Sequence, residues 1–188
     1  ETWLAGGQVG CNYQTGNWVW GIEGDAHAQR WSRGVTIAGV LPPLFVPGDI
    51  FELRSDWQAS VRGRIGYAWN RTMLYATGGV AFTEVRAYSN WIAAGIFPAT
   101  IAYDTQTLVG GTIGVGVEHA VTDNFTVGVE GRYSYYGNHR FDAGSVTTFI
   151  VGAAATNALT YRDVRVETGE VLLKANWKFG PGAVVAKY

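Results

Sequence analysis

Residues that cross-link or interrupt a chain are scarce in this sequence, which has one cysteine, one methionine and five prolines among 188 residues. The single Cys11 excludes an internal disulfide framework, and we interpret it as a small apolar strand residue rather than a reactive thiol. No run of about 18 apolar residues occurs, so no transmembrane helix is predicted. No signal-peptide pattern starts at Glu1, so we expect a mature, trimmed or incomplete chain.

The net charge is also small, at -1, which argues against a nucleic-acid partner. Glycine and aromatic residues are abundant instead, with 26 glycines and 14% aromatic residues. Together with a hydrophobic content of 47%, this composition predicts one ordered domain of tightly turned strands with few helices.

Residues 18–29 alternate between two kinds of side chain. Trp18, Trp20 and Ile22 fall on one face of a strand, whereas Glu23 and Asp25 fall on the other. Six further stretches repeat this alternation. The seven predicted strands are residues 2–14, 18–29, 57–69, 73–85, 107–119, 125–136 and 170–179.

The apolar faces of these strands carry no Asp, Glu, Lys or Arg at mid-strand, with Glu84 as the boundary case. A charge facing lipid costs roughly 2–4 kcal/mol at the bilayer midplane, whereas a soluble barrel has no need to exclude it. The pattern therefore predicts an all-β fold, a transmembrane antiparallel up-and-down β-barrel that is apolar outside and polar inside. A soluble ligand-binding barrel is the rival fold.

Short and long connections alternate along the chain. Tight turns are predicted at residues 15–17, 70–72 and 122–124, and long extracellular loops at residues 30–56, 86–106 and 137–168. The barrel takes residues 1–179, and residues 180–188 form a tail. The first and last predicted strands both run toward the tight turns, so seven strands cannot close a barrel. We therefore expect eight strands, with one ahead of Glu1 in the gene product.

Four stretches in sequence order carry a resemblance to a known family: NWVWGIEGDAHAQRW, VRGRIGYAWNRTMLYATGGVAF, GVGVEHAVTDNFTVGVEGRYSYYG and the terminal NWKF. They resemble the alphaproteobacterial outer-membrane immunogenic protein family, which includes hemin-binding surface antigens. The resemblance implies an OmpA-like eight-stranded barrel in the outer membrane of a Gram-negative bacterium, surrounded by outer-membrane lipid and lipopolysaccharide. Trp177 and Phe179 look like the C-terminal signal that the barrel-assembly machinery reads, which makes that machinery an implied partner.

Charged residues of both signs face the predicted interior. An eight-stranded barrel is only wide enough for side chains to fill it, so these residues predict an interlocked ion-pair network. An ion or proton path through a small porin-like barrel is the alternative. The network residues are Glu23, Asp25, Arg62, Arg64, Glu118, Glu130, Arg132 and Lys174.

The sequence predicts no catalytic residue, no metal site and no cofactor, because no motif with catalytic or ligand spacing occurs. His27 is interpreted as an interior residue, His119 as an interfacial one and His139 as a loop residue. Hemin coordination through His139, suggested by the hemin-binding relatives, is one alternative. A lipid-modifying enzyme that pairs Ser134 or Ser145 with His139 is another.

The predicted loops are more apolar than loops in water need to be, as in VTIAGVLPPLFVPGDIF and NWIAAGIFPATIAY. Contiguous exposed apolar surface of this kind marks an interface. We therefore expect a non-enzymatic structural or surface-interaction protein, whose loops contact another copy of the chain or another surface protein. The expected contact residues are Leu44, Phe45, Phe51, Trp91, Ile96, Phe97, Phe149 and Ile150.

Overall fold

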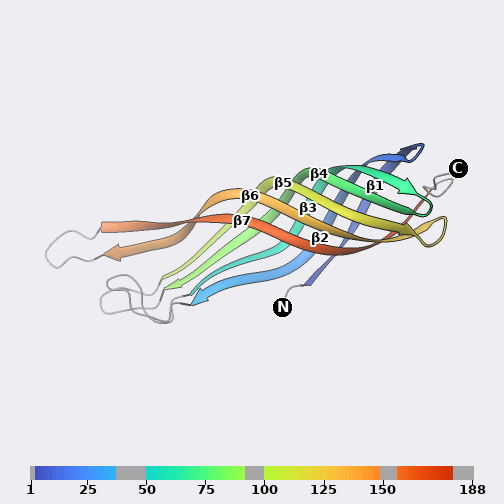
Figure 1. Cartoon of the computed structure of the whole chain (residues 1–188). Coiled ribbons are helices and arrows are strands. Elements are labelled where there is room, and N and C mark those ends of the chain that lie inside the picture. The colour runs from blue at the N-terminus through green and yellow to red at the C-terminus, as the bar shows by residue number, and fades with distance from the viewer. Residues whose placement is uncertain (1–2, 37–49, 92–99, 149–155, 180–188) are drawn as a thin grey trace.

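The computed structural model describes residues 3–36, 50–91, 100–148 and 156–179. They form one antiparallel sheet of seven strands, each paired with the next in sequence. The sheet curves into an open barrel with the tight turns gathered at one end (Figure 1). No helix in the described ranges is long and apolar enough to cross a membrane. The predicted all-β class and strand order are confirmed.

All seven predicted strands are present, and each overlaps its predicted range. Their bounds are Trp3–Thr15 (β1), Trp18–Thr36 (β2), Ile50–Trp69 (β3), Thr72–Trp91 (β4), Thr100–Ala120 (β5), Phe125–Thr148 (β6) and Thr156–Trp177 (β7).

The turn ends of the strands follow from local turn chemistry. Thr15 pairs with Trp18 across a two-residue turn in which Gly16 has a φ of 60°. Trp69 pairs with Thr72 in the same way, and Asn70 has a φ of 52°. Glycine and asparagine adopt this left-handed conformation most readily, so the turn ends were predicted to within a few residues.

The loop ends of the strands were predicted too short. Strands occupy part of each range predicted as a long loop, and β6 alone runs for 24 residues. The ladder register shifts between Ala28 and Trp31, between Ser55 and Gln58, and again within β6. Each irregularity breaks the period-two pattern, so alternation stops being readable where the strand continues.

The alternation itself places side chains on the predicted faces. Outward residues such as Val61 and Leu173 are exposed, whereas Arg62, the residue after Val61 on β3, is buried. Tyr75 and Val85 of β4 are buried inside, as the alternation along that strand requires. The exterior of the described barrel wall is therefore apolar and the interior largely polar.

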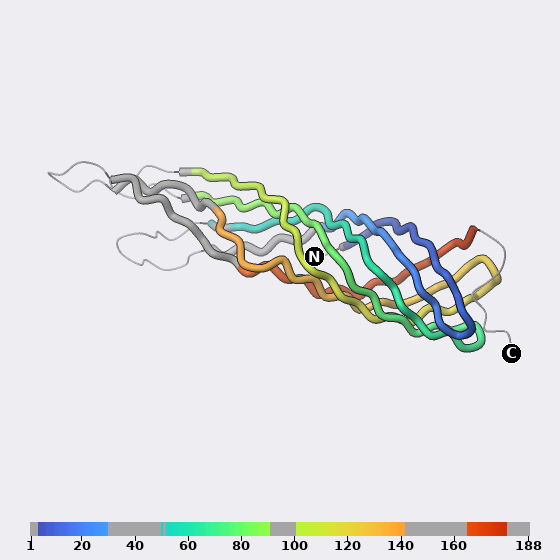
Figure 2. Tube along the Cα trace, turned by 90° about the horizontal axis from the view of Figure 1, so that it is seen from above, coloured from blue at the N-terminus to red at the C-terminus, as the bar shows by residue number. Residues whose placement is uncertain are grey.

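The first and last strands form the two edges of the sheet. β1, blue in Figure 2, and β7, red in the same view, pair with β2 and β6 but form no ladder with each other among the described residues. The amide of Gln8 on β1 nevertheless donates a hydrogen bond to Asn176 on β7. The edges thus approach each other across a seam that the ladder leaves open.

Candidate functional site

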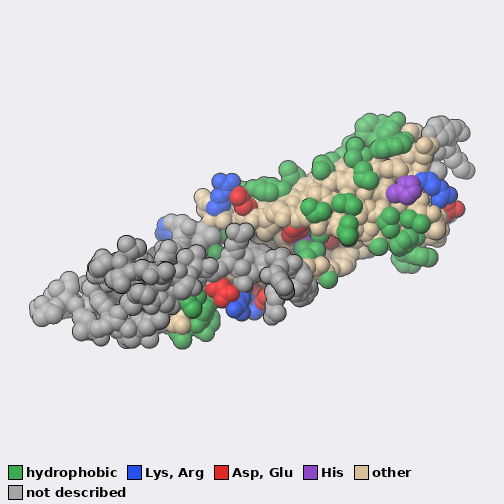
Figure 3. All heavy atoms as spheres, turned by 60° about the horizontal axis from the view of Figure 1, so that its bottom comes forward, with side chains coloured by type: hydrophobic (Ala, Val, Ile, Leu, Met, Phe, Trp, Pro, Cys, Tyr) green, Lys and Arg blue, Asp and Glu red, His purple; other side chains and the backbone are tan. Residues whose placement is uncertain are grey.

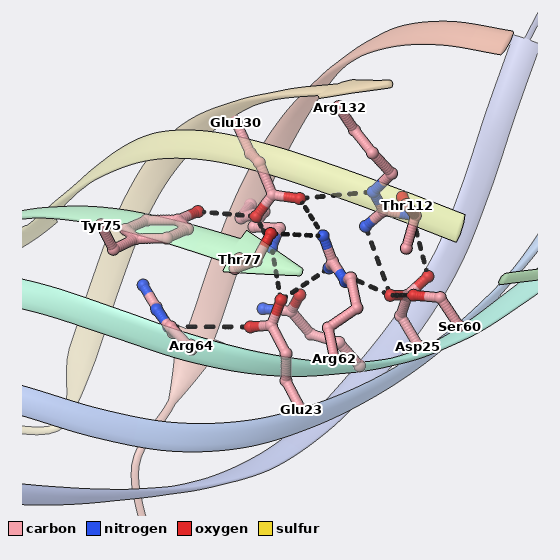
Figure 4. A network of polar contacts seen from close by, with 12 residues as sticks. Glu23, Asp25, Ser60, Arg62, Arg64, Tyr75, Thr77, Thr112, Glu130 and Arg132 are labelled. Carbon is pink, nitrogen blue, oxygen red and sulfur yellow. Dashed lines mark hydrogen bonds and ion pairs between the residues drawn. The ribbon is translucent and has the colours of Figure 1, made fainter. Parts of the chain in front are cut away.

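Charged side chains from five strands meet inside the barrel because neighbouring strands pair in register. Glu23 of β2 is the ladder partner of Arg62 of β3, and Arg132 of β6 is the partner of Glu170 of β7. Figure 4 shows the network formed by most of these side chains. We call the set the ion layer. Its members are Glu23, Asp25, Arg62, Arg64, Glu118, Glu130, Arg132, Glu170 and Lys174.

Arg62 is the centre of the ion layer. Its guanidinium is fully buried and lies 2.6 Å from Glu23 Oε1, 2.6 Å from Glu130 Oε1 and 3.1 Å from Asp25 Oδ1. It also donates a hydrogen bond of 3.1 Å to Thr77 Oγ1. A guanidinium has five N–H donors in a planar fork, so one arginine can hold several carboxylates in fixed positions.

The remaining cations extend this core in two directions. Arg132 lies 3.0 Å from Asp25 Oδ2 and 3.3 Å from Glu130 Oε1. Lys174 pairs with Glu130 from β7. Arg64 lies 2.6 Å from Glu118 Oε2, on the side of the tight turns. The result is a connected array of ion pairs rather than separate pairs.

The structure brings all eight predicted network residues together, and adds members that the sequence did not identify. Tyr75 donates a hydrogen bond of 2.9 Å to Glu130 Oε2, and its ring lies under the guanidinium of Arg64, 3.7 Å from the ring centre. Glu170 lies 3.9 Å from Arg132 and 4.0 Å from His27. Alternation placed Glu170 inside, but only the register of β6 and β7 could place it beside Arg132.

Two inward-facing glycines lie too close to their neighbours to carry a side chain. A Cβ on Gly116 would lie 2.5 Å from the Tyr75 hydroxyl, and a Cβ on Gly79 would lie 2.7 Å from Cα of Arg62. Contacts this short are incompatible with an added methyl group. Close packing inside the barrel therefore requires glycine at these two positions, one against the Tyr75 ring and one against the backbone of β3.

Two apolar layers enclose the ion layer along the barrel. The loop-side cluster comprises Leu53, Ala81, Val85, Ala87, Leu108, Tyr136, Phe141 and Val166. The turn-side cluster comprises Val19, Ala68, Met73 and Tyr75. Phe141, at 0% exposed, and Leu108, at 1%, fill the interior between the charges and the loop end. A water-filled path would have to pass this apolar filling.

The histidines and serines considered for heme or lipid chemistry have other neighbours. His139 lies in β6 rather than in a loop, and its Nε2 is 2.7 Å from the carbonyl of Tyr136. Ser134 is buried and donates a hydrogen bond of 2.8 Å to Thr112. Among the described contacts Ser134 and His139 make no hydrogen bond with each other, and the side chain of Ser145 lies outside the described part.

The outer wall carries an apolar band that ends at charged residues toward the loops. Figure 3 shows hydrophobic side chains spread over one face, with acidic and basic side chains next to each other farther along. We call these charges the ion-pair belt. It comprises Glu52, Arg54, Asp56, Glu84, Arg86, Arg165 and Glu167, with pair distances of 2.7–3.1 Å. The hydrogen bond with Glu52 raises the pKa of the Arg54 guanidinium above its usual value.

Exposed apolar residues reappear on the loop side of this belt. Tyr88 is two residues beyond Arg86 on β4 and is the ladder partner of Tyr103 on β5. Their ring centres are 5.2 Å apart, and Tyr103 is 76% exposed. We call this surface the rim patch. It comprises the exposed Ile50, Ile101 and Tyr103 and the partly buried Tyr88.

Most of the expected loop-contact residues cannot be placed. Leu44, Phe45, Ile96, Phe97, Phe149 and Ile150 lie outside the described residues. Phe51 and Trp91 belong to β3 and β4, and their side chains are outside the described part. Trp177 ends β7 with its ring 6.3 Å from that of Phe125, and Phe179 follows as an exposed residue.

Comparison with known proteins gives a family match over nearly the whole chain. The model for the outer membrane protein beta-barrel domain matches residues 2–179. The 25 kDa outer-membrane immunogenic protein of Brucella abortus biovar 1 (strain 9-941) is 30% identical over 169 residues, covering 90% of this chain and 65% of that protein. The 22 kDa outer membrane protein of Rhizobium leguminosarum bv. viciae is 34% identical over 147 residues, covering 77% and 59%.

The chain thus spans about two thirds or less of the length of these curated relatives. Their names describe outer-membrane and immunogenic proteins rather than enzymes. No solved structure matches the chain.

Proposed function

Because the chain belongs to the outer membrane β-barrel protein family and is an outer-membrane protein of a Gram-negative bacterium, we propose that it acts by surface interaction. In this proposal the barrel is an anchor without enzymatic activity, and its extracellular end binds a second copy of the chain or another surface protein. The observation that carries the proposal is the rim patch, an exposed apolar surface beyond the ion-pair belt.

The position of the rim patch relative to the bilayer supports this proposal. On β3 the outward apolar residues run from Tyr67 to Trp57, and charged Asp56 and Arg54 follow. A tilted strand crosses the hydrocarbon core in about 9–11 residues, so this apolar stretch is sufficient to span it. Tyr103 and Ile101 lie beyond the level of the belt, where lipid no longer explains exposed apolar side chains.

The chemistry of the patch also suits a protein partner. Tyrosine supplies a large apolar area together with a hydroxyl, and aromatic residues are enriched where proteins bind each other. The rim patch borders on charged residues such as Glu52, the ladder partner of Tyr88, which would form a polar rim around it. An apolar centre with a polar rim is the usual anatomy of a protein interface.

Transport is the second function considered, and the interior argues against it. The ion layer could line a path, but Phe141 and Leu108 fill the barrel between it and the loop end. An eight-stranded barrel has no spare interior volume for an aqueous channel. In a planar bilayer we therefore expect no measurable conductance, and stable channel events would support the transport alternative instead.

The test asks whether the protein, extracted gently from outer membranes, is a monomer, an oligomer or a complex with another protein. Native mass spectrometry should give an assembly for the wild type, and the double variant Ile101→Ser, Tyr103→Ser should release the protomer alone. Val121→Ser, which removes exposed apolar surface at the tight-turn end, is the matched control and should leave the assembly intact. A wild-type chain that leaves the membrane as a bare monomer, or a double variant with unchanged stoichiometry, would contradict the proposal.

A further inference from the structure

The wall of the barrel divides between β5 and β6 toward the loop end. The ladder between these strands ends at the pair of Gly111 and Tyr135, although β5 starts at Thr100 and β6 runs on to Thr148. Beyond that pair, in the described part of the chain, β5 forms a ladder only with β4, and β6 only with β7. Figure 1 shows the hairpin of β6 and β7 bending away from β5 at this end. Each of the two strands therefore has one free edge.

A β-bulge at Gly137 accounts for this division. Gly137 has a φ of 87°, and the register of β6 with β7 shifts between Tyr135 and Gly137. A glycine in this left-handed conformation bends the strand that carries it and can end its pairing with a neighbour. Just before the bulge the strands are close together, since a Cβ on Gly110 would lie 2.3 Å from the carbonyl oxygen of Tyr135. The bend therefore follows directly after the last close approach of β5 and β6.

The division starts at the level where the barrel leaves the hydrocarbon core. Tyr135 is the ladder partner of Glu167, and Thr107 on β5 is the partner of Glu84. Both glutamates belong to the ion-pair belt. Unpaired backbone groups are unfavourable in lipid, whereas water can hydrate them. The free edges therefore lie at and beyond the belt, where another polypeptide can reach them.

Side chains cap the free edge of β6 near its start. His139 Nε2 donates a hydrogen bond of 2.7 Å to the carbonyl of Tyr136, and Gln106 Nε2 donates one of 2.9 Å to the carbonyl of Arg140. Among the described contacts, no side chain caps the backbone of Thr105 on β5 in this way. The edge of β5 is therefore the less protected of the two.

The free edge of β5 has the properties of a template for a further strand. An antiparallel strand directs the N–H and C=O of every second residue to the same neighbour, so about half of residues 100–110 present theirs to the side that β6 has left. Outward along this edge, Tyr103 is 76% and Ile101 is 56% exposed, whereas Gln106 and Leu108 face inward. A strand that pairs here would place apolar side chains beside the rim patch and polar ones beside Gln106.

A second copy of the chain does not suit this edge. Copies in one membrane share their orientation, so only β2, β4 and β6 of a neighbour, among the described strands, run antiparallel to β5. β2 and β4 are paired on both sides, and the carbonyls of β6 at Tyr136 and Arg140 are already hydrogen-bonded. An extended segment of a different protein is the occupant that fits.

We propose that the edge of β5 from Thr100 to Gly110 binds an extended segment of another protein, which adds to the sheet as a strand antiparallel to β5. This inference rests on the proposed function and specifies how the loop end binds its partner. Backbone hydrogen bonds hold the segment, and the rim patch selects its outward side chains. The segment lies beside β5 in the position that β6 leaves at the bulge.

The probe is a synthetic peptide of about nine residues in which valine or tyrosine alternates with threonine, so that one face is apolar and the other polar. Two matched versions carry equal numbers of N-methyl groups. In one version the methyl groups block the amides that face β5 when the apolar face points outward, and in the other they block the amides between these. Binding to the full 188-residue chain, refolded in detergent micelles, is followed by fluorescence anisotropy.

The unmethylated peptide should bind, and methylation of the amides that face β5 should weaken binding at least about tenfold, because several backbone hydrogen bonds are lost. Methylation of the other amides should change the affinity little. No binding of the unmethylated peptide, or equal affinity of the two methylated versions, would overturn the added strand. If that equal binding disappears in the double variant Ile101→Ser, Tyr103→Ser, the rim patch still binds partners, and the proposed function stands without this inference.

Disulfide capture locates the bound peptide. A cysteine at the centre of the peptide should cross-link to the Thr105→Cys variant and not to Ala5→Cys, with Cys11→Ser in both. Ala5 is the matched control because it is also exposed, on β1, the first strand of the sheet. Capture at Ala5→Cys alone would overturn the proposal. A homodimer of the wild-type chain that excess peptide leaves intact would assign the edge to a second copy and would also overturn it.

Discussion

The ion layer and the loop-side cluster fill the same barrel with opposite chemistry. Around Arg62 nearly every inward position is charged, polar or glycine, whereas around Phe141 the inward positions are mostly apolar. Arg62 and Phe141 are both almost completely buried, so solvent exposure does not separate the two regions. They differ in how the cost of burying charge is avoided. In the ion layer the charges pair with one another, whereas the loop-side cluster contains no charge.

This difference bears on what the barrel does. A conducting barrel needs a continuous polar lining, and the loop-side cluster interrupts it. A buried ion network on its own is weak support for stability, since its attraction only offsets the desolvation of its charges. The two layers together are consistent with a closed anchor, in which the ion layer fixes one arrangement of strands and the apolar cluster adds burial energy.

Removing the central cation of the ion layer should cause the largest loss of stability. Arg62→Leu leaves Glu23, Asp25 and Glu130 with fewer partners in a buried site, and we expect a loss of about 3–5 kcal/mol in the free energy of unfolding. Urea titration of the protein refolded in lipid vesicles measures this loss. A change below about 1 kcal/mol would mean that the carboxylates find other partners or water.

Truncation in the loop-side cluster should come next. Phe141→Ala opens a cavity in the apolar filling, and a loss of about 3 kcal/mol is expected from the same titration. Val171→Ala, at an outward position on β7, is the control and should change little because lipid can fill the gap. Equal losses at both positions would show that Phe141 is not part of a packed core.

Tyr75 lies at the boundary between the ion layer and the turn-side cluster, and removing its hydroxyl should cause a smaller loss of stability. Tyr75→Phe keeps the ring under Arg64 and removes only the hydroxyl that hydrogen-bonds Glu130. We expect a loss of about 1.5–2 kcal/mol, since the acceptor is charged and buried. An unchanged unfolding midpoint would indicate that Lys174 alone satisfies that oxygen of Glu130.

The exposed ion pairs should have the smallest effect of all. Arg86→Leu breaks contacts with Asp56 and Glu84 that are open to water, and less than about 1 kcal/mol is expected. The comparison with Arg62→Leu isolates the contribution of burial, because both substitutions remove an arginine that pairs with carboxylates. Similar losses in the two variants would show that burial does not distinguish the ion layer from the ion-pair belt.

The fold could be predicted because alternation reports directly on which face of a strand meets lipid. Trp57, Val61 and Tyr67 share one face of β3, and turn residues such as Asn70 mark its end. The extensions of the strands could not be predicted, because the irregularities near Ala28 and Ser55 break the alternation. The alternation of side chains therefore predicted the parts of the strands that face lipid and did not predict their extensions beyond the irregularities.

The membership of the ion layer followed from the same alternation, but its pairings did not. Lys174 pairs with Glu130 although the ladder partner of Glu130 is Leu172. Such diagonal contacts depend on strand tilt and barrel curvature, which no single stretch of sequence encodes. The contact of Glu170 with Arg132 depends on the register of β6 and β7, which alternation within one strand does not give either.

The continuation of strands past the ion-pair belt has a thermodynamic consequence for recognition. Tyr88 and Tyr103 are held by a backbone ladder that runs unbroken from Thr72 to Trp91 on β4. A partner that meets such a ladder does not have to order a flexible loop, so little conformational entropy is lost on association. Under the proposed function the loop end is in this sense preorganised, and the rate at which it binds a partner should depend little on prior rearrangement of this surface.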